Sequence, residues 1–134
     1  MITEWNAPEI LARIKRGAMV GVIGWIGIVE ARAVQLITTP PKSGRIYRRR
    51  GVSHQASAPG EAPASDTGRL VNSRKITLDH DLVRARLSFA TAYAKALEIG
   101  TKKMEPRPFA RRALAETRDQ GAAAVADGIR GALK

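Results

Sequence analysis

The chain has no cysteine and few aromatic residues. Disulfide bonds and thiolate-bound metal sites are therefore excluded. Two Trp, two Tyr and two Phe are all that its 134 residues provide in large ring side chains, while alanine and glycine are abundant. A chain of this length forms one domain with a modest core, here a thin one for its size. We therefore expect contacts between subunits to supply part of the stability.

Long hydrophobic runs are also scarce. The main apolar run, residues 18–29, spans about 12 residues, whereas a membrane helix needs roughly 20. Charged residues flank it, among them Arg16 and Glu30. The N-terminus carries the acidic Glu4 and lacks the basic start of a secretory signal peptide. We expect a soluble protein without membrane contact.

Catalytic motifs are missing as well. The sequence has no cysteine nucleophile, no phosphate-binding loop pattern and no recognisable Ser–His–acid arrangement. Asp79, His80 and Asp81 suggest a metal site by composition, but we interpret them as a turn because no second histidine is near. His54 is equally isolated. We expect no enzymatic activity, no cofactor and no metal.

Positive charge is in excess, with 23 Lys and Arg against 12 Asp and Glu, a formal net charge of +11. It is most concentrated in residues 42–50, where Ile46 and Tyr47 are expected to pair with residues 52–56 across a turn near Gly51. The cluster indicates contact with nucleic-acid phosphates or an acidic protein surface; the alternative is an exposed hairpin without a partner. Because Tyr47 is its only aromatic residue, base-specific recognition is not expected. The cluster consists of Lys42, Arg45, Arg48, Arg49 and Arg50.

The N-terminal third predicts a helix from about Pro8 to Leu36, with a break near Gly17. Its apolar residues recur at three- and four-residue spacings. Four glycines interrupt it, and each costs about 0.5–1 kcal/mol relative to alanine. Close approach of another backbone explains them, either the C-terminal helix or a neighbouring subunit. A strand over residues 20–29 is the alternative. The glycines are Gly17, Gly21, Gly24 and Gly27.

The remaining segments predict short elements. Residues 56–67 form an extended, partly mobile loop rich in Ala, Pro and Ser, and Ser65 or Asp66 is expected to cap a short helix ending at Asn72. Residues 74–90 alternate as a hairpin with its turn at 79–81.

A helix is expected to end at Gly100, and the last helix to run from about Pro108 to near Leu133. Phe109, Ala113 and Leu114 would make its first buried contacts. We expect one α+β domain, residues 1–134, with a long N-terminal helix, an antiparallel hairpin sheet and a C-terminal helix packed on the sheet. Residues 40–68 form the basic hairpin and extended loop within it.

Two blocks of residues stand out by their composition and spacing. The first is residues 58–73, which contain Pro-Gly and Asp-Thr-Gly-Arg-Leu. The second comprises Tyr93, Ala94, Glu98, Gly100, Thr101, Lys103, Met104, Arg107, Pro108, Phe109, Ala113 and Leu114. Together the blocks resemble a family of small neck proteins of long-tailed bacteriophages, the tail-completion or tail-component proteins. Ile99 departs from the family's usual aromatic, and Arg112 from its frequent proline.

The resemblance implies a structural virion protein, made in the host cytoplasm and assembled into the virion neck. Its subunits would form a homo-oligomeric ring, favoured as a hexamer with a dodecamer possible, between the tail tube and the head connector. The basic cluster would contact DNA in the lumen or an acidic neighbour. The alternative is a small basic nucleic-acid-binding architectural protein. The residues expected at subunit interfaces are Pro59, Glu61, Pro63, Asp66, Glu98, Lys102, Lys103, Arg107 and Phe109.

Overall fold

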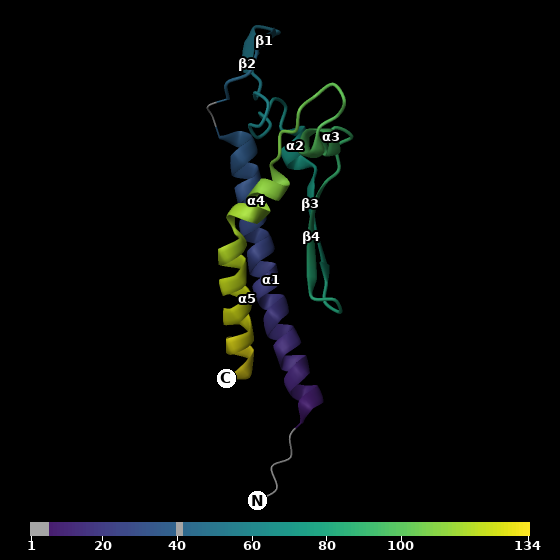
Figure 1. Ribbon diagram of the computed structural model, residues 1–134, viewed down its shortest axis with the longest axis vertical. Coiled ribbons are helices and arrows are strands. Elements are labelled where there is room, and N and C mark those ends of the chain that lie inside the picture. Colours follow the sequence, from purple (N-terminus) through teal and green to yellow (C-terminus); the bar gives the residue numbers. More distant parts are fainter. Residues whose placement is uncertain (1–5, 40–41) are drawn as a thin grey trace, which may run out of the picture.

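The computed structural model describes residues 6–39 and 42–134, and it confirms the α+β class. One long helix runs along most of the molecule, with the other elements arranged beside it and at one end (Figure 1). In chain order the elements are α1 (Ala7–Thr38), β1 (Ile46–Arg49), β2 (Val52–Gln55), α2 (Arg69–Asn72), β3 (Arg74–Asp79), β4 (Arg84–Phe89), α3 (Ala94–Ile99), α4 (Ala110–Glu116) and α5 (Arg118–Leu133).

Helix α1 is continuous, so the expected break near Gly17 and the alternative strand over residues 20–29 are both wrong. Asn6 caps its start by accepting a hydrogen bond from the Glu9 backbone N–H at 3.3 Å. Two positions of α1 require glycine because the α5 backbone lies against them. A Cβ at Gly17 would overlap Gly128, and one at Gly21 would overlap Val125. The interpretation that the glycines admit the C-terminal helix is thus confirmed for these two.

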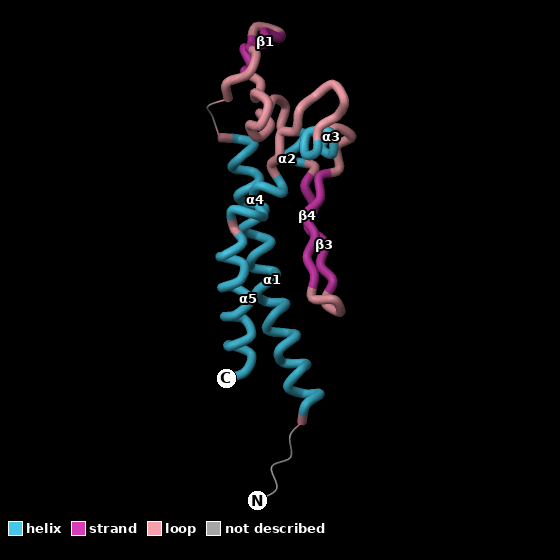
Figure 2. Tube along the Cα trace, in the orientation of Figure 1, coloured by secondary structure: helices cyan, strands magenta, loops and turns pink. Residues whose placement is uncertain are grey.

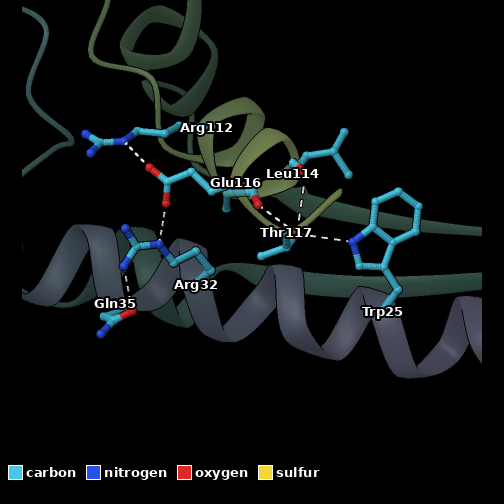
Figure 3. Close-up of polar contacts among 8 residues, drawn as sticks. Trp25, Arg32, Gln35, Arg112, Leu114, Glu116 and Thr117 are labelled. Carbon is cyan, nitrogen blue, oxygen red and sulfur yellow. Dashed lines mark hydrogen bonds and ion pairs between the residues drawn. The ribbon is translucent and has the colours of Figure 1, made fainter. Parts of the chain in front are cut away.

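The expected single helix over residues 108–133 is divided at Thr117, where α4 ends and α5 begins. The Thr117 hydroxyl donates to the Ala113 carbonyl at 2.8 Å, the back-bonding that commonly bends helices. It also accepts the indole N–H of Trp25 from α1 at 3.1 Å (Figure 3). The division therefore coincides with a polar contact that joins α1 to the C-terminal segment.

Helix α5 packs along α1, and α4 also contacts α1. We expected the C-terminal helix on the sheet; instead the sheet element β4 contacts α1 separately. The physical reason is that α1 has glycine at two positions, Gly17 and Gly21, where the backbone of α5 can approach closely. At the far end of this contact, Arg13 of α1 donates to the Ala132 carbonyl at 2.8 Å.

The strands form two separate antiparallel hairpins rather than one sheet (Figure 2). In the first, Ile46 pairs with Gln55 and Tyr47 with His54, which confirms the predicted pairing of residues 46–47 with 52–56; the strand also continues to the pair Arg49–Val52. The second runs from the pair Arg74–Phe89 to the pair Asp79–Arg84, so its turn comprises residues 80–83 rather than 79–81.

The core lies near the C-terminal half of α1, where α4, β4, α2 and α3 meet. Phe109 is 1% exposed and meets Phe89 edge to face, with ring centroids 4.9 Å apart. Ala113 is buried as expected, but Leu114 is 46% exposed, because α4 turns that side chain away from α1. The cluster comprises Val29, Ala33, Leu36, Ile37, Ala62, Leu70, Ala94, Phe109 and Ala113.

One face of α1 is left uncovered by residues 6–39 and 42–134. Val20 is 65% exposed, and Ile23 and Ile28 are exposed beside it. A Cβ at Gly24 or Gly27 would meet no atom within 4 Å, so these glycines lack the backbone contact that accounts for Gly17 and Gly21. The two glycine pairs therefore have different environments.

By length and composition α1 meets the criteria for a membrane span, with an 18-residue window of mean hydropathy 1.6, of which 28% is buried. The sequence estimate of about 12 apolar residues was too short, since a few charges within a window still leave it apolar. Core helices of soluble proteins and N-terminal signal sequences meet the same criteria. The expected absence of membrane contact stays a prediction.

Candidate functional site

The basic hairpin β1–β2 stands at the end of the molecule opposite the start of α1 and the end of α5 (Figure 1). Its side chains Arg45, Arg48, Arg49 and Arg50 are exposed, and in the described part of the chain none of them forms an ion pair. Arg45 lies over the Tyr47 ring at 5.9 Å from its centroid. The arrangement offers several unneutralised guanidinium groups to a phosphate or carboxylate surface.

Arg50 and Gly51 form the hairpin's two-residue turn, and both have positive φ, 51° and 81°. These signs fit a type I′ turn, which matches the twist of the flanking strands. Arginine is rarely found in this left-handed conformation. The turn therefore places a charged side chain at the tip at some cost in backbone energy.

Lys42 does not belong to this cluster, contrary to the sequence expectation. Its ammonium donates to the Leu36 carbonyl at 2.7 Å, near the end of α1. Burial lowers its pKa, partly offset by the nearby Glu61 carboxylate. A lysine placed there satisfies a helix carbonyl that has no partner within the helix.

The loop over residues 56–68 is held against its own chain. The Glu61 carboxylate accepts hydrogen bonds from the backbone N–H groups of Ser43, at 3.0 Å, and Ala58, at 2.8 Å, and from the Ser43 hydroxyl. These bonds, the hydroxyl's foremost, lower the pKa of Glu61 to about 2. Pro63 is buried and Pro59 exposed. Glu61, expected at a subunit interface, thus ties the loop to the base of the hairpin.

Asp66 was expected to cap a helix, but α2 begins after Gly68, which has φ 75° and supplies no side chain. The helix is shorter than predicted, so Ser65 and Asp66 lie too far upstream to cap it. Asp66 is exposed, and its assignment to a subunit interface stays a prediction.

Glu98 of α3 caps the start of α4. Its carboxylate accepts from the backbone N–H groups of Phe109, Ala110 and Arg111 at 3.0, 3.1 and 2.9 Å. This satisfies the free N–H groups of a helix start and places negative charge at its positive end. The cap therefore ties the start of α4 to α3.

The other residues between α3 and α4 that were predicted at a subunit interface include both exposed and buried side chains. Lys102 and Lys103 are exposed in the turn closed by the Thr101 N–H and the Met104 carbonyl at 2.8 Å. Phe109 is buried within its own chain, so its assignment to a subunit interface is wrong. A phenyl ring packed against Phe89 is not available to a partner.

Glu116 joins two arginines that the sequence did not single out together (Figure 3). Its carboxylate is 2.5 Å from Arg32 Nε of α1 and 2.8 Å from Arg112 Nε of α4. Hydrogen bonds from Arg32, then Arg112, lower the pKa of Glu116. The spacing of Arg112 and Glu116 is a helical one and could have been read from the sequence; the contact with Arg32 spans 84 positions and could not.

The residues that suggested a metal site form a turn. Asp79 accepts from the Leu82 backbone N–H at 3.0 Å and from Arg84 at 3.2 Å, and the first of these is the main cause of its lowered pKa. Over residues 6–39 and 42–134, no three His, Asp or Glu side chains are grouped as metal ligands.

Comparisons with known proteins give no relative: no family model, curated protein or solved structure matches the chain.

Proposed function

We propose that this chain is a structural virion protein of the bacteriophage neck, forming a ring that completes the tail and joins it to the head connector. The observation that carries the proposal is that the two blocks of the resemblance fold against each other. The Gly60 N–H donates to the Pro106 carbonyl at 3.2 Å, and Arg107 donates to Ser57, just before the first block, at 3.0 Å. Two segments that lie 46 positions apart in the chain, counted from Gly60 to Pro106, are thus held together in the fold.

The uncovered face of α1 supports assembly of several copies. Val20, Ile23, Gly24 and Gly27 form an apolar and narrow strip, on which a second helix could lie close. A chain with a thin core gains stability by burying such a strip between subunits. In the proposed ring this face contacts the adjacent copy.

The basic hairpin supports the position around a DNA channel. The hairpin that carries the arginines lies at one end of an elongated molecule (Figure 1), where a ring could direct it inward. Contacts with phosphates alone bind any sequence, which suits a passage for the whole genome. The proposed function is therefore structural, without catalysis or cofactor.

The same hairpin also favours a second function, that of a free nucleic-acid-binding architectural protein. Four arginines within residues 45–50, which form no ion pair with any residue that the structure describes, would bind duplex DNA in solution without a ring. This alternative leaves the contact between the two motif blocks without a role.

Two measurements distinguish the neck protein from the architectural protein: the mass by light scattering over a range of concentrations, and negative-stain imaging. Rings of six or twelve subunits, formed alone or on adding tail-tube protein, are expected for the neck protein. A monomer or dimer that ignores tail proteins and binds duplex DNA below physiological salt would instead establish the architectural protein.

A further inference from the structure

A cavity of about 380 Å³ lies between the basic hairpin, the loop over residues 56–68 and the helices α2 and α3. Three arginines from three separate elements line it: Arg49 of β1, Arg69 of α2 and Arg107 from the segment before α4. Neither the sequence pattern nor the proposed ring function assigns a role to this convergence.

The cavity is left with positive charge. Within the described residues Arg49, Arg69 and Arg107 form no ion pair. Asp66 is the one carboxylate among the lining residues. Three guanidinium groups against one carboxylate leave two positive charges, which match a dianion better than a monoanion.

Arg107 is fixed in place and yet has a donor without an acceptor. Its backbone N–H donates to the Leu97 carbonyl at 2.7 Å, and its Nη1 to the Ser57 hydroxyl at 3.0 Å. Its Nε is buried and has no partner among the described residues. A buried donor left unpaired is costly, and a bound oxyanion would remove that cost once the Arg107 side chain shifts toward the cavity.

The cavity has room for more than an oxyanion. Tyr93 and Leu97 give it an apolar wall, next to the guanidinium groups. A ligand with a charged end and an organic remainder would use both surfaces.

We propose that this cavity binds the dianionic phosphate of a phosphomonoester. A phosphomonoester carries nearly two negative charges at neutral pH, whereas a carboxylate or a backbone phosphodiester carries one. The ligand class is distinct from the backbone phosphates expected at the hairpin tip. The site is complete in one chain and so does not depend on ring assembly.

The test is titration of the full chain with inorganic phosphate at constant ionic strength, followed by NMR, with chloride as the competing anion. The hairpin provides a matched control, because Arg49 lines the cavity and its neighbour Arg48 does not. Arg49→Gln and Arg69→Gln are each expected to weaken phosphate binding about tenfold, while Arg48→Gln leaves it unchanged. All three side chains are exposed, so the variants are expected to fold, which the dispersion of the NMR spectrum checks.

A second arm identifies the source of the phosphate. An oligonucleotide bearing a 5′-phosphate is compared with the same strand lacking it. Tighter binding of the phosphorylated strand than of the strand that lacks the 5′-phosphate assigns the site to strand ends; equal binding of the two strands assigns it to small phosphates. Absence of saturable phosphate binding, or equal losses in Arg48→Gln and Arg49→Gln, would overturn the proposal.

Discussion

Gly17 of α1 and Gly128 of α5 lie in backbone contact, so that a Cβ on either residue would collide with the other. One helical turn further along α1, Gly21 meets the backbone of Ala124 and Val125 in the same way. This contact joins the first and last helices of the chain.

Replacing Gly21 with alanine is expected to destabilise the fold by about 1–3 kcal/mol, since its Cβ would have to displace backbone. Gly24→Ala is the matched control, because that position is open and alanine has the better helix propensity. Gly24→Ala should raise the free energy of unfolding of the monomer by about 0.5–1 kcal/mol. Urea denaturation measures the free energy of unfolding of both variants. Equal effects of the two substitutions would contradict the close backbone contact between α1 and α5.

Glu98→Ala is expected to cost about 1–2 kcal/mol of stability, because three backbone N–H groups at the start of α4 lose their acceptor. Glu98→Gln, which keeps one acceptor oxygen, should lose less. Glu105→Ala serves as the control, since that side chain is exposed. Urea unfolding curves give the three values, and an unchanged midpoint in Glu98→Ala would show that the cap does not contribute.

Glu61 is expected to make the free energy of unfolding depend on pH in the acidic range. Its folded pKa of about 2 lies below the ordinary value of 4.5, so the folded state favours the carboxylate. Its contribution is complete above about pH 4.5 and is lost as pH falls toward about 2. The stability difference between the wild type and Glu61→Gln should shrink through this window. NMR titration of the carboxyl group measures the pKa directly, and Ser43→Ala should raise it.

Arg50→Asn is expected to remove one positive charge from the hairpin tip while the turn keeps its conformation. Asparagine adopts the left-handed conformation more readily, so the turn at φ 51° should be kept or strengthened. The affinity for duplex DNA should fall, and the slope of log affinity against log salt should decrease by about 0.9. Lys15→Gln, which removes one charge near the other end of the molecule, is the control. Equal salt slopes for the two variants would show that the tip does not contact phosphate.

Val20→Lys is expected to abolish the proposed ring assembly, because it places a charge on the uncovered face of α1. Leu82→Lys is the matched control: both side chains are 65% exposed, and Leu82 lies in the turn between β3 and β4. Light scattering measures the mass of each variant. Rings formed equally well by both would exclude this face as the subunit contact.

Local signals in the sequence predicted most of the elements. Gly100 ends α3 with φ 76°, and Gly51 completes the first hairpin turn. Alternation of apolar and polar residues predicted the second hairpin, because strand faces follow a period of two. Such signals depend on a few neighbouring residues and are therefore readable without a structure.

Contacts between distant segments could not be read in this way. Gly17 and Gly24 occur in the same glycine pattern, yet one faces a helix and the other does not. Lys42 is part of a basic run, but it turns back to the end of α1. Phe109 belongs to a motif, and burial rather than partner contact explains its place in it.

The pairing of α1 with α5 also sets the order in which the chain can complete its fold during synthesis. Residues 7–38 leave the ribosome before α5, and α5 supplies the residues that cover Gly17 and Gly21. Until then the apolar side of α1 has no helix to cover it, and contacts of such high sequence separation form slowly. A nascent chain therefore exposes an apolar helix face, which chaperones or neighbouring nascent chains can bind before α5 packs on α1.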